Sequence, residues 1–468
     1  MHKLAQLDHR YVWHPFTQMQ DWVKTEPIVI TRGRGAVLTD AHGRRYLDAN
    51  ASIWVNLHGH GHPKINAAIQ RQLKKIAHSS ALGYANEPAS LLAEKLIKLA
   101  RTPARAGIAK SPQLAKVFYS DNGSTALEVA LKLAYEYTRR TRPKHRRPRF
   151  LSLDGAYHGD TIGAVSLGHI DLFHQAYRGM LFATDKVMAP YCYRCPFNRA
   201  QPERADARDY RRCQWECLGL LEKKFTAQKK TGHAYAAFVF EPLMQGAAGM
   251  IPQPNGWLQQ AVSLARSHGT LTIADEVMTG FGRTGSLFAC QQAGFLPDFL
   301  CLAKGLTGGY LPMAATLTTQ RVFSAFLGEY AEFKSFFHGH SFTGNQLGSA
   351  AALASLELLH ENGAAQKRKA LEKTFEKVLA TLWDLPQIGD IRQAGLVAGI
   401  ELVQDWRTRR PYALTQQAGI RVCAAMARRG VLTRHIGSVI VLMPPYCTRP
   451  AQLYKMVATL RKAIQETL

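Results

Sequence analysis

One unit recurs through the middle of this chain and constrains its fold most: an apolar run, then a small or polar turn, then a helical pattern. The run at 116–120 is followed by a predicted helix at 125–134, and a predicted helix at 256–268 is followed by the run at 271–274. Further apolar runs occupy 150–153, 236–240 and 299–303. Such alternation predicts an α/β fold with a mostly parallel sheet covered by helices on both faces.

The last third of the chain has a different pattern. Helices are predicted at 348–360 and 367–382, short strands at 399–402 and 439–442, and a terminal helix from Arg449. This pattern indicates a smaller α+β domain, joined by a strand-forming region at 28–47. We therefore expect an N-terminal segment, 1–60, that is part of the small domain, a large domain at 61–335 and a C-terminal small domain at 336–468.

Composition excludes several classes of protein. With 468 residues, of which 46% are hydrophobic and 20% charged, the chain does not resemble disordered, collagen-like or coiled-coil sequences. No apolar run approaches the roughly 20 residues of a membrane helix. The first ten residues contain no uninterrupted apolar stretch of the secretory kind, so we expect a cytoplasmic protein that does not bind membranes.

The chain is strongly basic. Lys and Arg number 59 against 34 Asp and Glu, a net charge of +25, which would suit anionic partners. The densest basic segment, 139–149, contains Pro143 and Pro148, so we interpret it as a solvated loop between a helix and a strand. A nucleic-acid-binding protein is the alternative from another class, but the charge does not gather beside aromatic residues, and we expect no nucleic acid as partner.

Four of the eight cysteines cluster in a Cys- and Arg-rich insertion at 190–218. Cys192 and Cys195 are followed, after 17 residues, by Cys213 and Cys217, a spacing close to that of zinc ribbons. The cluster is either a structural zinc site or a group of reduced thiols, and the spacing alone does not decide between them. We assign no metal to the site that carries the chemistry.

Chemistry-bearing residues follow the predicted strands. Lys304 comes directly after the run at 299–303, and a buried amine is neutral and can form a Schiff base with an aldehyde. Asp275 ends the preceding strand and can keep a pyridine nitrogen protonated. Gly123 and Ser124 open a helix, where backbone N–H groups can bind a phosphate, and Tyr157 can cover an aromatic ring.

Each of these residues also has a purely structural interpretation, as a surface lysine, a helix cap or a half-buried tyrosine. Their order along the chain, each at the end of a predicted strand, favours a pyridoxal phosphate site at the carboxyl edge of the sheet. The motifs at 120–125, 157–160, 274–285 and 302–309 resemble those of the class III pyridoxal-phosphate aminotransferases of fold type I. The resemblance implies a seven-stranded, mostly parallel sheet in the large domain.

The resemblance also implies roles for these residues. Lys304 would hold the cofactor and then carry the proton, Asp275 would hold the pyridinium, Tyr157 would cover the ring, and Gly123 with Ser124 would bind the phosphate. His340 and Ser341 would reach the phosphate from the neighbouring subunit, which implies a homodimer with active sites at its interface. Transamination would follow a ping-pong course between small-molecule substrates.

Segments at 14–19, 54–59, 337–346 and 442–446 look like the biotin-pathway branch of this family. That branch converts 8-amino-7-oxononanoate to 7,8-diaminononanoate. By the same resemblance, Arg434 would pair with the substrate carboxylate, and Gly339 and Trp54 would line the substrate pocket. The alternative is another class III aminotransferase, acting on ornithine, 4-aminobutyrate or a diamine.

Three positions depart from the branch that uses S-adenosyl-L-methionine as amino donor. Phe16 and Val441 stand where tyrosine is usual, and Ile53 stands where a second tryptophan is common. These differences do not touch the cofactor residues. They leave two donors open, S-adenosyl-L-methionine and L-lysine.

Overall fold

The structure, a computed structural model, describes residues 1–101, 112–145 and 147–468. Its central element is a seven-stranded sheet in which four of the six strand pairings are parallel, and only β12 runs against its neighbours. The order across this sheet is β4 (Leu114–Ser120), β12 (Ala314–Thr319), β11 (Phe299–Leu302), β10 (Leu271–Asp275), β7 (Ala237–Phe240), β5 (Phe150–Leu153) and β6 (Asp185–Val187). The predicted fold class is confirmed.

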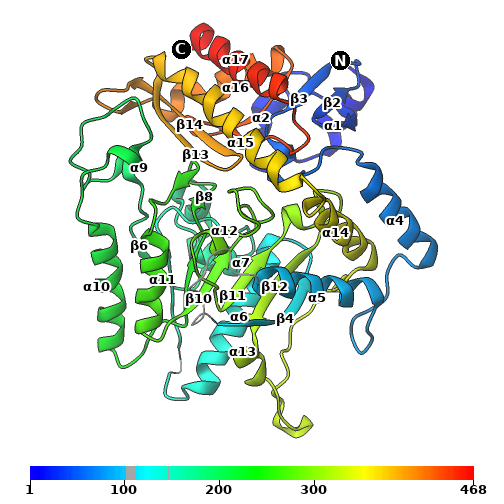
Figure 1. Cartoon of the computed structure of the whole chain (residues 1–468), viewed down its shortest axis with the longest axis vertical. Helices are drawn as coiled ribbons and strands as arrows, with labels where there is room; N and C mark the ends of the chain where they lie inside the picture. Colours follow the sequence, from blue (N-terminus) through cyan, green and yellow to red (C-terminus); the bar gives the residue numbers. More distant parts are fainter. Residues whose placement is uncertain (102–111, 146) are drawn as a thin grey trace.

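Helices cover both faces of the sheet, as Figure 1 shows for its lower half. Strand β7 illustrates why, because successive side chains point to opposite faces. Phe238 and Phe240 pack with the helices on one side, while Ala237 and Val239 pack with α6 on the other. The first face carries α5 (Glu87–Arg101), α10 (Glu216–Lys230), α11 (Trp257–Ser267) and α14 (Gln346–Leu359), and the second carries α6 (Gly123–Thr141) with α7 (Ile162–Leu167) and α13 (Gln320–Ser324) at its margins.

The N-terminal and C-terminal regions of the chain both lie in the upper part of the molecule (Figure 1). Strand β16 (Val431–Leu432) pairs in parallel with β3 (Arg45–Asp48), which completes a sheet with β1 (Ile30–Arg34) and β2 (Val37–Asp40). A second sheet contains β13 (Ile388–Ala394), β14 (Val397–Asp405), β15 (Arg410–Pro411), β17 (Arg434–Ile436) and β18 (Val439–Leu442), and packs with α15 (Ala364–Ala380), α16 (Ala418–Arg428) and α17 (Pro450–Thr467). The proposed domain boundaries at 60 and 335 stay predictions.

Shorter elements complete the described chain. They are α1 (Lys3–Tyr11), α2 (Met19–Trp22), α3 (Ala51–Trp54), α4 (Pro63–Lys75), α8 (Asp171–His174), α9 (Ala207–Tyr210), α12 (Ala289–Gln292), β8 (Met244–Gln245) and β9 (Ile251–Pro252). Among the described residues, no helix combines the length and apolarity needed to cross a membrane.

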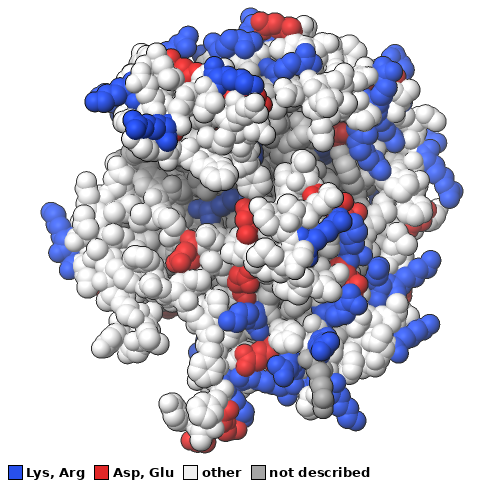
Figure 2. Space-filling model, turned by 180° about the vertical axis from the view of Figure 1, so that it is seen from behind, with Lys and Arg blue, Asp and Glu red and all other residues white. Residues whose placement is uncertain are grey.

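The basic segment 139–149 links α6 to β5, as predicted, except that its first three residues still belong to the helix. Arg140 is part of the packing there, because its guanidinium donates to the backbone oxygens of Ala325 and Lys334. Arg146 lies outside the described residues. Viewed from behind, Lys and Arg side chains are spread over the surface and gather towards its lower right (Figure 2).

Candidate active site

A cavity of about 740 Å³ lies at the carboxyl edge of the seven-stranded sheet. Strands β5, β7, β10 and β11 each end in a residue, or lead into a turn, that lines it. The predicted residues that it brings together are Trp54, Gly123, Ser124, Tyr157, Asp275 and Lys304. Parallel strands bring such residues to one edge because their carboxyl ends coincide there.

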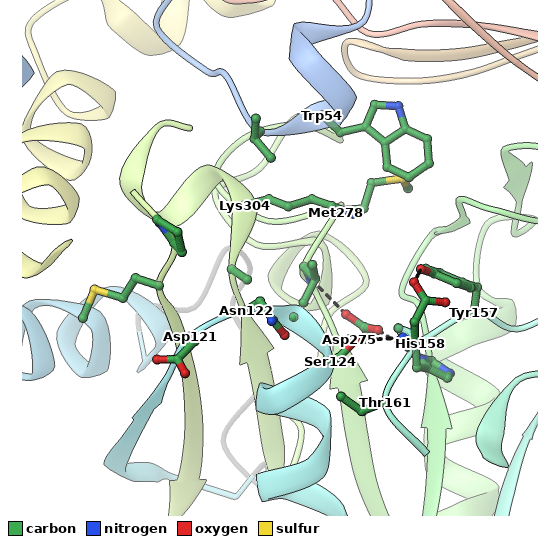
Figure 3. Close-up of a pocket in the computed structure, with 18 of the residues that line it drawn as sticks. Trp54, Asp121, Asn122, Ser124, Tyr157, His158, Thr161, Asp275, Met278 and Lys304 are labelled. Carbon is green, nitrogen blue, oxygen red and sulfur yellow. Dashed lines mark hydrogen bonds and ion pairs between the residues drawn. The ribbon is translucent and has the colours of Figure 1, made fainter. Parts of the chain in front are cut away.

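Lys304 follows β11 and extends across the top of the cavity towards Trp54 in Figure 3. Its Nζ lies 4.7 Å from the centroid of the Trp54 ring. Burial lowers the pKa of the Lys304 amine, although Asp275 and Glu241 act in the opposite sense. The residue also has a left-handed backbone, with φ of 44°, which is uncommon for a side chain of this size and fixes the direction in which the amine leaves the strand.

Asp275 is buried at the end of β10, on the opposite side of the cavity from Lys304 (Figure 3). Its Oδ2 lies 2.7 Å from Nδ1 of His158, and its Oδ1 accepts a 3.1 Å hydrogen bond from the Val277 amide. His158 is buried as well, and its Nε2 has no hydrogen-bond partner among the residues that the structure describes. Nothing in the sequence analysis gave His158 a role, although it stands next to Tyr157 in the motif at 157–160.

Glu241 is a second residue that the sequence analysis left without a role. It follows β7, lines the cavity and accepts hydrogen bonds from the amides of Gly246 at 2.7 Å and Tyr157 at 3.3 Å. Burial raises the pKa of the Glu241 carboxyl to about 7, and Asp275 adds to the rise while His158 opposes it. Its position at the end of a strand, like that of Asp275, was the sequence signal that could have identified it as a site residue.

The start of α6 forms a narrow part of the cavity. Asn122 and Thr125 cap the helix reciprocally, and Ser124 Oγ accepts a 2.9 Å hydrogen bond from the Asp160 amide. A Cβ on Gly123 would stand 2.7 Å from Val277 Cγ1, so the backbone approaches its neighbours more closely than any side chain would permit. The first amides of a helix have no intrahelical acceptors, which makes this turn suitable for an anion.

Tyr157 lines the cavity, and its hydroxyl donates a 2.7 Å hydrogen bond to Asp160. Burial raises the pKa of this phenol, the hydrogen bond to Asp160 adds to the rise, and Arg434 acts in the opposite direction. Arg434 therefore lies close enough to Tyr157 to interact with it electrostatically. Arg434 comes from β17, in the C-terminal sheet, where it is the register partner of Val441.

Arg434 is absent from the lining of this cavity, and so are three predicted residues of one loop, Gly339, His340 and Ser341. Gly339 and Ser341 are exposed, and the Ser341 carbonyl lies 2.8 Å from His78 Nε2. His340 Nδ1 lies 3.5 Å from the Asp121 carboxylate, near the start of α6. Their contribution to a partner subunit's site stays a prediction, as do the roles of the other residues.

Phe16, Ile53 and Val441, which differ from the residues usual in the S-adenosyl-L-methionine-using branch, lie in different surroundings. Phe16 is exposed, and its ring packs edge-on at 5.3 Å against Phe173. Ile53 is 45% exposed, whereas Val441 is fully buried in an apolar cluster that includes Trp54. The cluster consists of Trp54, Met244, Met250, Met278, Val397, Val441 and Met443.

The four cysteines of the insertion are free thiols, with Cys192 and Cys217 buried. Burial raises the pKa of the Cys192 thiol to about 12 and that of Cys217 to about 11, and the neighbouring cysteines add to both shifts. Within residues 1–101, 112–145 and 147–468, no group of three or more His, Cys, Asp or Glu side chains is arranged to hold a metal ion.

Comparison with known proteins gives a consistent result. The family model of class III aminotransferases matches residues 18–464. Adenosylmethionine-8-amino-7-oxononanoate aminotransferase of Nitratidesulfovibrio vulgaris is 48% identical over 99% of this chain and 81% of its own length. The crystal structure of the enzyme with this name from Methanocaldococcus jannaschii superimposes with a TM-score of 0.89 at 38% identity, over 99% of both chains.

A PLP-bound amine transaminase from an uncultivated Pseudomonas species superimposes with a TM-score of 0.87 at 32% identity, over 98% of this chain and 99% of its own. The match to the family model spans nearly the whole sequence, and the fold and the cavity occur in the arrangement that the sequence predicts for such an enzyme. The chain thus belongs to the class III aminotransferases, enzymes whose cofactor is pyridoxal 5'-phosphate.

Proposed function

We propose that this enzyme transfers an amino group to the 7-oxo carbon of 8-amino-7-oxononanoate and so forms 7,8-diaminononanoate in biotin biosynthesis. Relatives that carry the corresponding name are 48% and 46% identical over nearly the full chain. The proposed amino donor is S-adenosyl-L-methionine, in keeping with those names, and L-lysine is the competing donor.

The residues around the cavity fit pyridoxal 5'-phosphate. His158 Nε2 is a buried polar atom without a partner in the described part of the chain, and the turn at Gly123 has no room for a side chain where a phosphate needs close approach to the backbone. When bound, the cofactor supplies an electrophilic carbonyl and a pyridinium ring that withdraws electrons from the substrate's reacting carbon. Gly123 and Ser124 would hold its phosphate, and Tyr157 would lie against its ring.

Lys304 and Asp275 divide the acid–base work. Because burial lowers the pKa of Lys304, its amine is more readily neutral than an exposed lysine, and a neutral amine can attack a carbonyl and accept a proton from the substrate's Cα. Asp275 is fixed by His158 and the Val277 amide, and its carboxylate would hold the cofactor's ring nitrogen in its protonated form.

The substrate assignment rests on one observation: an apolar cluster at the cavity lies beside the cationic side chain of Arg434. Trp54 and Val441 belong to one apolar cluster, and Arg434 is paired with Val441 across the β17–β18 ladder. An acceptor with a long alkyl chain that ends in a carboxylate can lie against Trp54 and Met278, the members of the cluster that line the cavity, and pair with Arg434. Ornithine and 4-aminobutyrate have shorter chains and would cover less of this wall.

The direct test uses purified holoenzyme and follows 7,8-diaminononanoate by mass spectrometry. Each donor is first added alone, and conversion of the cofactor to its aminated form is read from the absorbance spectrum; the acceptor is then added. The proposal expects conversion with S-adenosyl-L-methionine and product with the acceptor. Conversion with L-lysine alone corrects the donor, and failure to aminate 8-amino-7-oxononanoate with either donor overturns the function.

The proposal includes a homodimer. Five apolar side chains between 73 and 91 are exposed in the single chain, and the loop that carries His340 and Ser341 contacts the same segment through His78 and Ser79. The five are Leu73, Ile76, Leu82, Tyr84 and Leu91. Exposed apolar patches mark interaction surfaces. Sedimentation at micromolar concentration should give the mass of two chains, and a monomer that retains full activity would contradict the homodimer.

The proposal also places the reaction in the cytoplasm. All eight cysteines are free, which suits a reducing compartment. Fractionation of the producing cells tests this part, and recovery of the enzyme outside the cytoplasmic fraction would contradict it.

A further inference from the structure

A strained backbone segment stands directly before the cavity. Ala51, Ser52, Ile53 and Trp54 all have positive φ, between 45° and 70°, so α3 is a single turn of left-handed helix. The Trp54 amide donates to the Asn50 carbonyl, and the amides of Val55 and Asn56 donate to the Ala51 carbonyl. For residues other than glycine this handedness crowds Cβ against the next carbonyl, so a run of four such residues needs compensation from its surroundings.

The compensation comes from one buried carboxylate, Asp48. Its Oδ1 accepts the amides of Asn50 and Ser52 at 3.2 and 3.1 Å. Its Oδ2 accepts the Ser52 hydroxyl at 2.9 Å and lies 2.9 Å from His60 Nε2. Burial acts to raise the pKa of Asp48, but the hydrogen bonds from His60 and Ser52 outweigh it and hold the pKa below its usual range.

The turn is packed against the loop that follows Lys304. A Cβ on Gly309 would stand 2.9 Å from backbone atoms of Val55 and Asn56, and a Cβ on Gly305 would stand 3.1 Å from Leu57. The segment after the turn therefore fits against the lysine loop without a gap. A change in the backbone at 51–54 would be felt at the wall formed by Trp54, which lies over Lys304.

Asp48 also links the turn to the C-terminal sheets. It is the register partner of Leu432 in the β3–β16 pairing, and Arg434 follows two residues later. The Ala49 amide donates to the Leu432 carbonyl, and the Ala49 carbonyl accepts from Met443. The indole of Trp54 is fixed by a 2.9 Å hydrogen bond to Asn50 Oδ1. The two ends of the proposed acceptor site thus meet at one short segment.

From these contacts we propose that Asp48 and Ser52 are positioning residues that hold the left-handed turn, so that Trp54 keeps its place in the substrate wall. They do not touch the cofactor residues. This inference rests on the proposed function for the identity of the acceptor only. Loosening the turn raises the KM for the acceptor and leaves cofactor binding and kcat close to those of the native enzyme.

The test compares Asp48→Asn with Asp40→Asn in the holoenzyme. Asp40 is a matched control, because it is equally buried at the end of β2 and accepts the amides of His42 and Arg44 and the Tyr46 hydroxyl, away from the cavity. We expect Asp48→Asn to raise the acceptor KM about tenfold, with kcat changed less than about threefold, and Asp40→Asn to leave both unchanged.

Ser52 provides a second pair of variants: Ser52→Ala loses only the hydroxyl, and Ser52→Gly loses the whole side chain. Ser52→Ala keeps a side chain in the left-handed region, whereas Ser52→Gly adopts that region without strain, so the KM should rise more in Ser52→Ala. A purely structural role would not produce this order. Equal KM values for Ser52→Ala, Ser52→Gly and the native enzyme would overturn the proposal, whether or not Asp48→Asn folds.

Amide hydrogen exchange over residues 50–56 gives a readout independent of the substrate. Exchange should accelerate in Asp48→Asn and Ser52→Ala and stay as in the native enzyme in Asp40→Asn. Unchanged exchange contradicts this inference and leaves the proposed function intact. A native enzyme that is inactive on 8-amino-7-oxononanoate overturns the proposed function, and exchange still tests the turn.

Discussion

The side chains around Lys304 line the cavity from one part of the fold, whereas the apolar cluster around Trp54, which reaches the cavity through Trp54 and Met278, comes from other parts. The cofactor side (Gly123, Ser124, Tyr157, Asp275 and Lys304) is built from the carboxyl edge of one sheet, in chain order. The proposed substrate side (Trp54, Val441, Arg434 and the rest of the apolar cluster) joins the N-terminal turn, the β8–β9 region and the C-terminal sheet. In the proposed division, a single sheet edge supplies the residues for the chemistry, and an assembly of distant segments supplies those that select the substrate.

The largest effect on the proposed division between cofactor side and substrate side is expected from removal of the Lys304 amine. Lys304→Ala should abolish the visible cofactor band and lower transamination by more than about 10⁴-fold, because no other side chain on the cofactor side supplies a neutral amine. Steady-state turnover and the absorbance spectrum measure both effects. Lys186→Ala, which removes an exposed lysine paired with Asp154, is the control and should behave as native. Retained turnover in Lys304→Ala would refute the division of the cavity.

The next effect concerns the ring nitrogen. Asp275→Asn keeps the size of the side chain but removes the charge that faces the pyridinium, so kcat should fall about a thousandfold with little change in KM for either substrate. Single-turnover amination of the cofactor isolates this step. If KM rose and kcat stayed native, Asp275 would belong to the substrate side instead.

The substrate side should show the reverse pattern. Arg434→Gln removes the bidentate cation, and we expect the KM for 8-amino-7-oxononanoate to rise about a hundredfold while the cofactor spectrum stays native. Arg421→Gln, on the exposed face of α16, is the matched control. An acceptor analogue without the carboxylate should bind the native and Arg434→Gln enzymes equally, and a difference between them would contradict the pairing.

The smallest expected effect is the pH dependence of stability that Glu241 contributes at the cavity. Burial raises the pKa of Glu241 from an ordinary value near 4.5 to about 7, so folding favours its protonated form. Its contribution to stability is complete below pH 4.5 and is lost as the pH rises through 7. Denaturant titrations of the cofactor-free protein from pH 5 to 7 should show a loss of roughly 1 kcal/mol per pH unit from this group.

Glu241→Gln should reduce that slope without removing it. Glu276 and Asp390, whose pKa values burial also raises to about 7, keep their own share of the slope. An identical slope in the variant and the native protein would show that Glu241 is already ionised in the folded state at pH 5.

The cofactor side was predictable from the sequence because its signals are local. A strand followed by Asp275 or by Lys304 is visible within ten residues, and parallel strands then bring the two to the same edge. The predicted runs at 150–153, 271–274 and 299–303 match β5, β10 and β11 to within one residue. His158 was missed because its burial against Asp275 is a contact across 117 positions.

The substrate side depends on contacts that no local pattern shows. The left-handed turn at 51–54 contains no glycine, so its composition does not predict a positive φ. Strand β12 was missed because the chain there follows the lysine loop and returns antiparallel, outside the strand–helix alternation. The resemblance to class III aminotransferases supplied Trp54 and Arg434, and the place of His340 in a partner's site stays a prediction.

The central claim is that one amine, on one side of this cavity, holds the cofactor opposite Asp275. Borohydride reduction of the native holoenzyme, followed by proteolysis and mass spectrometry, tests it directly, because reduction fixes the cofactor to the lysine that carries it. The account predicts a phosphopyridoxyl group on the peptide that contains Lys304 and on no other peptide. Label on a different lysine, or none anywhere in a protein that retains its visible absorbance before reduction, would contradict it.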